Sequence, residues 1–214
     1  MPASSASGEP TRVLTTKGRQ TQNAIERSAR KLFAERGFHG TTLADITSAA
    51  GKSPAVFYRY FTDKEDLLAA LAESFLHNVL TPSGLSLHLP DSPTDDAFFT
   101  SVVTGYWNMF KQNIGIMIAV AQLAATQPRF ATVQNEFRRF GIDIVAASVR
   151  RAQQQGYGSE LNPEHTAAAI GLLFESFTTV FVGASGLGSA GFRISDHDAI
   201  VTLSTIWKKT LYGV

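Results

Sequence analysis

The sequence has 214 residues, enough for one large or two small domains, and 44% of them are hydrophobic, so the chain can bury a substantial core. It contains no cysteine, which excludes disulfide bonds, thiolate metal sites and a cysteine nucleophile. The net charge of +1 hides an asymmetry: residues 12–66 carry ten Lys/Arg against six Asp/Glu, whereas residues 67–214 carry nine against eleven. A basic N-terminal part indicates a polyanionic partner at that end.

Residues 1–16 are small and polar and include two prolines, so we expect a disordered N-terminal tail. They contain no long apolar run ahead of a small-residue cleavage site, so no signal peptide is expected. The most apolar windows, 114–125 and 167–184, contain Gln122 and Glu175, and the first is too short to span a bilayer. We therefore expect a cytoplasmic protein without a membrane partner.

From about residue 17 to residue 36 the pattern is helical, with Ile25, Ala29, Leu32 and Phe33 on one apolar stripe. Gly37 is placed to end this helix, because glycine adopts a left-handed conformation without steric cost. The stripe predicts a helix that covers one side of a small core.

Residues 41–66 contain several helix boundaries within a short span. Ser53 is a good N-cap and Pro54 a good first helical residue, so the chain forms two short helices, about 43–50 and 54–60, joined by a tight turn. A longer helix follows from about 63 to 80. Two short helices at a tight turn predict a helix-turn-helix, whose second helix can enter the DNA major groove. Two capping boxes are predicted, Thr42 with Asp45 and Thr62 with Glu65.

The remainder shows only helical periodicity after a break at residues 81–93, which are rich in Pro, Ser and Gly. No segment alternates apolar and polar residues between turn signals, so the fold class is all-α. We place a DNA-binding domain at residues 17–66 and a second helical domain at 67–214. Further helices are predicted from about residue 95, and at about 115–126, 129–155, 163–184 and 195–212.

The helix-turn-helix segment resembles a known family over about residues 17–70. The shared positions are Gly37-Phe38, Thr41-Thr42, Asp45-Ile46, Ala50-Gly51, Ser53, Phe57-Tyr58, Tyr60-Phe61, Lys64-Glu65 and Leu67. As a set they are similar to the N-terminal signature of TetR-type transcriptional regulators. The resemblance implies a nine-helix protein that binds DNA as a homodimer and is not an enzyme. Most members of that family repress transcription, and a small molecule releases them.

The resemblance also implies which residues contact an operator. The recognition helix is Pro54 to Tyr60, and its N-terminal end faces base edges. Two further residues, at the N-termini of neighbouring helices, are placed where backbone N–H groups favour phosphate. Arg59 either reaches the DNA or stays solvated, and Phe57 and Phe61 are assigned to the core. The predicted DNA-binding residues are Thr42, Lys52, Ser53, Pro54, Ala55, Tyr58, Arg59, Tyr60 and Lys64.

Dimerisation and effector binding are expected in the second domain. The resemblance points to helices 163–184 and 195–212 as the dimer surface, with an ordinary core role as the alternative. An apolar effector would bind among aromatic side chains, although such a stripe also suits a core. The predicted ligand-binding residues are Tyr106, Trp107, Phe110, Met117, Gln122, Phe137, Phe140, Phe174 and Phe177.

Three other functions were weighed. Residues 186–191 match GxGxxG, but a dinucleotide site needs a preceding strand and a following helix within a βαβ unit, and too few residues remain. The histidines stand far apart and no GxSxG or HExxH occurs, so no metal, cofactor or hydrolase site is expected. The remaining alternative is a helical small-molecule-binding or scaffold protein without specific DNA binding.

Overall fold

The computed structural model describes residues 15–81, 88–183 and 191–213. Over these residues the chain is all-α, as predicted, with nine helices and no strand. The expected tail and the GxGxxG run at 186–191 lie wholly or largely outside the described residues. The helices are α1 (Thr16–Arg36), α2 (Leu43–Ala49), α3 (Pro54–Phe57), α4 (Lys64–Leu80), α5 (Asp96–Gln112), α6 (Ile114–Ala124), α7 (Pro128–Gln154), α8 (Pro163–Val182) and α9 (Asp196–Tyr212).

The helix boundaries follow local capping chemistry. The capping box at the start of α2 is present, with Thr42 and Asp45 each accepting a backbone N–H of the other. The predicted box of Thr62 with Glu65 is wrong. Asp63 caps α4 instead, accepting the N–H of Asp66 at 2.7 Å, because a carboxylate already stands at the N-cap position.

The recognition helix is shorter than predicted. α3 ends at Phe57, and residues 58–60 form a turn in which the amides of Arg59 and Tyr60 bond to carbonyls three residues back. This tighter bonding often closes a helix whose chain must reverse direction. Here it turns the chain toward α4.

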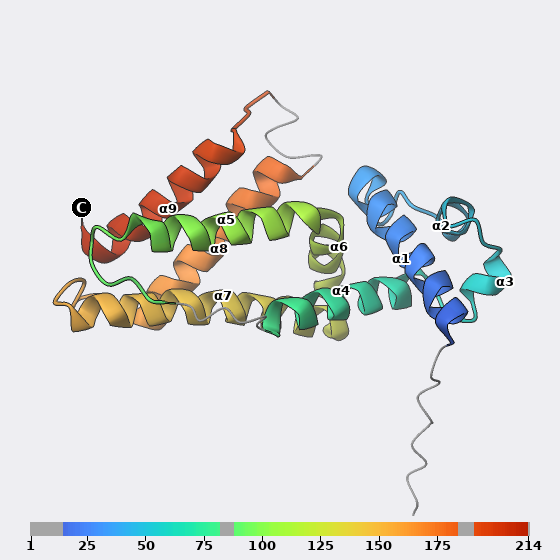
Figure 1. Cartoon of the computed structure of the whole chain (residues 1–214), viewed down its shortest axis with the longest axis horizontal. Coiled ribbons are helices and arrows are strands. Elements are labelled where there is room, and N and C mark those ends of the chain that lie inside the picture. Colours follow the sequence, from blue (N-terminus) through green and yellow to red (C-terminus); the bar gives the residue numbers. More distant parts are fainter. Residues whose placement is uncertain (1–14, 82–87, 184–190, 214) are drawn as a thin grey trace, which may run out of the picture.

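The helices α1, α2 and α3 lie together at one end of the molecule, and α4 runs from them into the body (Figure 1). In the body, α7 packs on α6 and α8, α5 packs on α9, and α4 packs on α6 and α7. One long helix therefore connects the helix-turn-helix directly to the helices of the body.

The first hydrophobic core does not stop at the predicted domain boundary. It joins α1–α4 to side chains of α6 and to Phe130 at the start of α7. Gly115 lets α6 approach α1 closely, since a Cβ there would meet the backbone of Ala34 and lie 2.6 Å from the carbonyl carbon of Phe33. The N-terminal helices therefore share their core with part of the body.

The second core fills the space between α5, α7, α8 and α9. Its largest side chains are Trp107 and Trp207, at 1% and 0% exposure. Each indole N–H is bonded, Trp207 to the Ser148 hydroxyl at 3.1 Å and Trp107 to the Asp196 carboxylate at 3.0 Å. These bonds remove the cost of burying an indole donor and hold α9 in one position.

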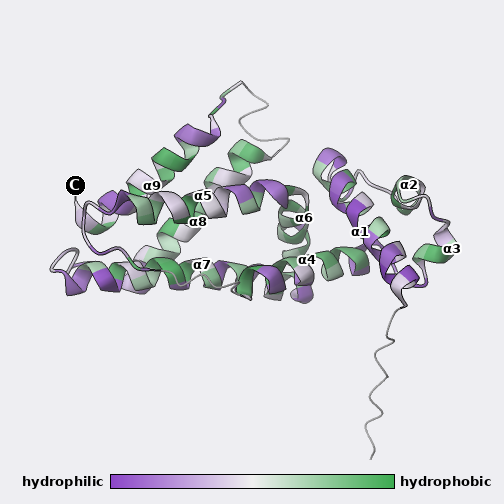
Figure 2. Ribbon diagram, in the orientation of Figure 1, coloured by the Kyte–Doolittle hydropathy of each residue, from purple (hydrophilic) through white to green (hydrophobic). Residues whose placement is uncertain are grey.

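The helix α8 is strongly apolar, as its colouring shows (Figure 2). Among the described residues it is the one helix that could cross a membrane by length and composition alone, a test that helices packed within proteins also pass. Its Glu175 is ion-paired with Arg138 of α7.

Candidate nucleic-acid interface and cavity

The helices α1–α3 form the N-terminal unit. The α2–α3 turn places the recognition helix, α3, at the surface of this unit. Gly51 adopts a φ of 63°, and the N–H of Lys52 bonds to the Thr47 carbonyl at 2.9 Å, which closes the turn. Ser53 then caps α3 by accepting the N–H of Val56. Phe57 is fully buried and attaches the other side of this short helix to the core.

Most of the residues predicted to bind DNA are accessible. Tyr58 is the most exposed of the large hydrophobic side chains described on this unit, at 61%, although its ring edge contacts Phe57. The exposed members are Thr42, Ser53, Pro54, Ala55, Tyr58 and Arg59, whereas Lys52, Tyr60 and Lys64 are half-buried. The structure thus presents the N-terminal end of α3, together with Tyr58 and Arg59, as one outward face.

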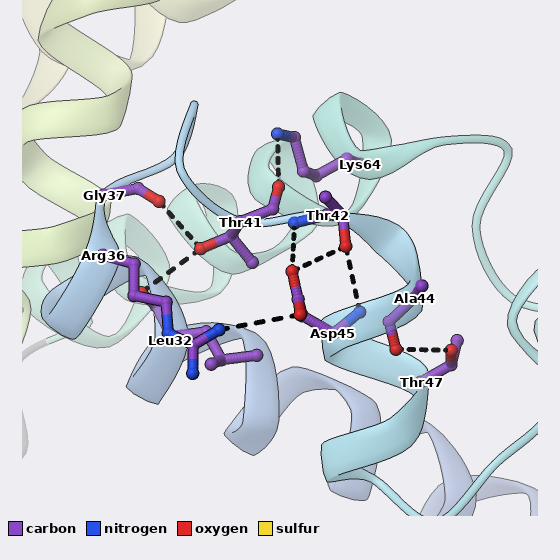
Figure 3. A network of polar contacts seen from close by, with 9 residues as sticks. All are labelled: Leu32, Arg36, Gly37, Thr41, Thr42, Ala44, Asp45, Thr47 and Lys64. Atoms are coloured by element: carbon purple, nitrogen blue, oxygen red, sulfur yellow. Dashed lines mark hydrogen bonds and ion pairs between the residues drawn. The ribbon is translucent and has the colours of Figure 1, made fainter.

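Lys64 has a structural role that was not predicted from the sequence. Its ammonium donates to the carbonyls of Phe38 and Thr41, both at 2.7 Å, and lies 4.2 Å from the centre of the Phe38 ring. Figure 3 shows it directed at the Thr41 carbonyl. Burial lowers the pKa of Lys64. The side chain therefore holds the α1–α2 connection, and two of its three donors are occupied within the chain.

A polar network fixes the start of α2 (Figure 3). The Thr42 hydroxyl lies 2.6 Å from Asp45, whose other carboxylate oxygen is 3.6 Å from Arg36 of α1. The hydrogen bonds from Thr42, with a smaller contribution from Arg36, lower the pKa of Asp45. The buried Thr41 hydroxyl donates toward the carbonyls of Gly37 and Leu32. The N-terminus of α2 is thus held rigidly against α1.

A cavity of about 310 Å³ lies between α4, α6, α7 and α8, with Phe110 of α5 on its wall. This volume is at the lower end of the range for small-molecule sites. The lining is mostly apolar and consists of Ala72, Phe75, Leu76, Phe110, Ile116, Met117, Ile118, Val120, Ala121, Gln122, Val133, Gln134, Phe137, Glu175 and Thr179. Ala121 and Gln122 are exposed and so lie at its rim.

The polar part of the cavity wall is concentrated on α7 and α8. Glu175 accepts two hydrogen bonds from Arg138, each at 2.7 Å, and a third from the Gln134 amide at 3.3 Å. The bond to Glu175 raises the pKa of Arg138. Glu175 and Gln134 line the cavity, whereas Arg138 does not. The carboxylate therefore stands between the cavity and its counter-charge.

Four of the nine residues predicted to bind a ligand line this cavity: Phe110, Met117, Gln122 and Phe137. The other five do not. Trp107 and Phe174 are buried in the second core, with Tyr106 and Phe177 packed against it, and Phe140 is half-buried on α7 outside the lining. Helical spacing alone does not say which neighbour each row of aromatic side chains meets, and here much of α5 faces α9.

Two parts of the cavity wall were not predicted from the sequence: the α4 wall, and the polar wall formed by α7 and α8. Phe75 is not among the predicted ligand-binding residues, and nothing in the pattern showed that it would meet Phe137 of α7, with ring centres 5.6 Å apart. Glu175 did carry a signal, since a carboxylate in the middle of an otherwise apolar helix needs a partner. The partner, Arg138, is 37 residues away in the chain.

Comparison with known proteins supports the same interpretation. The sequence model of a family described as "Bacterial regulatory proteins, tetR family" matches residues 25–71. The HTH-type transcriptional regulator EthR of Mycobacterium tuberculosis is 27% identical over 202 residues, covering 92% of this chain and 89% of that protein. UidR of Escherichia coli, also an HTH-type transcriptional regulator, is 25% identical over 168 residues, covering 76% and 80%.

Solved structures share the fold. The transcriptional regulator FadR from Bacillus subtilis, in complex with stearoyl-CoA, superposes with a TM-score of 0.63 over 90% of this chain and 98% of that one, at 18% identity. At this level of identity the likeness shows the arrangement of helices and nothing about the ligand.

Proposed function

We propose that this chain, which belongs to the tetR family of bacterial regulatory proteins, is a cytoplasmic repressor that binds a palindromic operator as a homodimer and is released by a largely apolar small molecule. Like the other members of its family it is a DNA-binding transcriptional regulator and not an enzyme. The operator, the dimer and the release by ligand are the parts that we propose.

One observation carries the proposal: the DNA-facing unit and the cavity share side chains. Ala72, Ile116 and Val120 belong to the first core and also line the cavity. A molecule that fills the cavity therefore contacts the side chains against which α1–α4 pack. It can shift the DNA-facing unit only if it binds the DNA-competent and the released states unequally.

The proposed operator contacts divide by chemistry. Ser53 and Ala55 lie at the end of α3 that faces base edges, where the Ala55 methyl suits a thymine methyl. Pro54 starts the helix, and Tyr60 borders the same turn. Thr42, Lys52, Tyr58 and Arg59 suit backbone contacts, and Arg59 also has the reach for guanine. Lys64, with two donors occupied, contributes chiefly by holding the α1–α2 connection in place.

The proposed dimer surface is the outer face of α8 and α9. Leu172 and Leu173 of α8 are 52% and 40% exposed, and Val201 and Ile206 of α9 are 46% and 39% exposed. On α8, Leu172 and Leu173 share one face with exposed Ala169 and Ser176, at spacings of three and four residues; with Val201, Thr205 and Ile206, which are exposed on α9, they make up the α8–α9 stripe. Exposed aliphatic side chains gathered on helix faces often mark a contact site, and a two-fold pairing would bury them.

The proposed effector is apolar because the lining is apolar. The FadR structure holds stearoyl-CoA, which shows that this arrangement of helices accommodates an aliphatic ligand in at least one protein. The cavity of about 310 Å³ here favours a smaller molecule than an acyl-CoA.

Genome-wide selection of bound DNA fragments tests the proposal most directly. We expect one palindromic sequence whose half-sites are separated by about 34–36 Å, or a multiple, to be bound about a thousandfold tighter than random duplex. The affinity for this sequence should fall with rising salt: the logarithm of the binding constant, plotted against the logarithm of the salt concentration, should have a slope of about −0.9 for each phosphate contacted. If no fragment is preferred over random DNA, the chain is a helical binding protein without specific DNA recognition.

A further inference from the structure

Two walls of the cavity differ in chemistry. The α4 wall consists of Ala72, Phe75 and Leu76 and is wholly apolar. The α8 wall carries Glu175 and Thr179, with Gln134 of α7 beside them. A molecule that satisfies both walls must be amphiphilic, with its apolar part toward the helix that leads to the DNA-binding unit.

The ion pair at the polar wall determines which charge the amphiphile can carry. An anionic head would meet the Glu175 carboxylate first, because Arg138 approaches that carboxylate from outside the lining. A cationic head would meet a carboxylate that already accepts three hydrogen bonds, two of them from a guanidinium. Either charged head would lose hydration at a partly buried wall without gaining a free counter-ion.

An uncharged head meets no such penalty. A carboxylate has about four acceptor positions, and Glu175 uses three, so one position remains for an O–H or N–H donor of a ligand. The Thr179 hydroxyl and the Gln134 amide add groups that both donate and accept. This wall matches an alcohol or a primary amide.

We propose that the effector is an uncharged amphiphile, an aliphatic or aromatic molecule with an alcohol or amide head, and that the Arg138–Glu175 ion pair excludes carboxylates and amines from the cavity. The inference rests on the proposed function only in taking this cavity as the effector site. The charge selection itself is a property of the chain and can be measured without DNA.

Three probes that differ only in their head test the selection: 1-decanol, decanoate and decylamine, each titrated calorimetrically into the full-length protein at pH 7.5. We expect decanol to bind about tenfold tighter or more than either charged probe. Ala121→Trp, which adds bulk at the exposed rim, should weaken decanol binding if the probe enters this cavity.

Charge variants sharpen the test. Glu175→Gln leaves Arg138 without its carboxylate and should shift the preference toward decanoate, whereas Arg138→Gln should shift it toward decylamine. The double variant should restore the preference for decanol. The binding of decanoate by Glu175→Gln and of decylamine by Arg138→Gln itself shows that the single variants are folded. Glu164→Gln, which breaks the exposed pair with Arg150 at the other end of α8, is the matched control and should leave the preference unchanged.

Several results would overturn the inference: decanoate or decylamine bound by the wild type as tightly as decanol, none of the three bound, decanol binding unaffected by Ala121→Trp, or an unchanged preference in Glu175→Gln. Gel shifts on the selected operator, run in parallel, keep the two proposals separate. Loss of specific DNA binding would count against the regulator, whereas a wrong order of probe affinities would count only against the charge selection.

Discussion

The two hydrophobic cores of this protein end at different kinds of surface. Around the first core, the exposed large hydrophobic side chain of α1–α3 and their turns is Tyr58, at 61% exposure beside Ser53 and Arg59. Around the second, the exposed large hydrophobic side chains of α8 and α9 are aliphatic and include Leu172 and Val201, at 52% and 46%. The first surface suits a hydrated, charged partner and the second suits another apolar surface. The proposed DNA contact and the proposed self-association would therefore lie on surfaces of different cores.

Charge placed on the α8–α9 stripe should have the largest effect. Leu172→Glu with Val201→Glu brings like charges together across a two-fold interface, which costs several kcal/mol, so the dimer should dissociate about a hundredfold more readily or worse. Light scattering with size-exclusion chromatography measures the mass. Operator binding should weaken as the dimer dissociates, since the proposed dimer reads two half-sites together.

Leu80→Glu is the control for that pair of substitutions, because Leu80 is also an exposed aliphatic residue, at 42%, but ends α4 away from the stripe. It should leave the dimer mass unchanged. A double variant that still has the mass of the wild type would remove α8 and α9 from the interface.

Gly115→Ala tests whether the first core truly extends into the body. The added methyl would collide with backbone atoms of Phe33 and Ala34, which cannot rotate away, so we expect a loss of about 1–3 kcal/mol in the free energy of unfolding. Gly105→Ala in α5 has nothing within 4 Å and should be neutral or stabilising by about 1 kcal/mol. Urea denaturation of both variants gives the difference, and equal stabilities would mean that α1 and α6 are loosely joined.

Substitutions at Tyr58 and Lys64 should distinguish a residue that contacts DNA from one that supports the fold of the N-terminal unit. Tyr58→Ala should weaken operator binding by about tenfold while the melting temperature and dimer mass stay unchanged, because the side chain is exposed. Lys64→Ala should lower the melting temperature as well, since two carbonyls lose a charged donor. An undiminished gel shift for Tyr58→Ala would remove that residue from the interface.

Lowering the pH should have the smallest effect on stability, and it should act on a carboxylate in each of the two regions. Hydrogen bonds from Lys111 and Trp107 lower the pKa of Asp196, as those from Thr42 lower the pKa of Asp45. Because each folded-state pKa is below the ordinary value, the stabilisation is complete above pH 3.8 and is lost as the pH falls through the folded-state pKa. Asp196→Asn keeps an acceptor for Trp107, so the difference in melting temperature between wild type and variant should be small at pH 7 and vanish toward pH 2. A difference that grows with acid would contradict this account.

The starts of most helices could be predicted from the sequence because N-caps act locally. Ser53 with Pro54 marks the start of α3, and Asn162 with Pro163 marks the start of α8, each through groups a few residues apart. The helix-turn-helix was predictable for the same reason. The error at Thr62 was also local, since Asp63 is as good a cap and stands one residue nearer the helix.

The polar wall and the Lys64 contacts were not predictable in this way. Arg138 and Glu175 lie on different helices, and Lys64 reaches carbonyls 23 and 26 residues away. Spacing within a helix says which side chains share a face but not which helix that face meets. The aromatic residues of α5 show the consequence, because most of them face α9 and the second core rather than the cavity.

By itself, then, the sequence determined an all-helical chain, the starts of most of its helices and a helix-turn-helix with an accessible second helix, because hydrogen bonds and steric limits between near neighbours decide these features. Only the tertiary structure decided that the first core runs on into α6, that the cavity has one apolar and one polar wall, and that Lys64 supports the loop before α2. Those features depend on close packing between distant segments, and a single missing Cβ at Gly115 is enough to allow one of them.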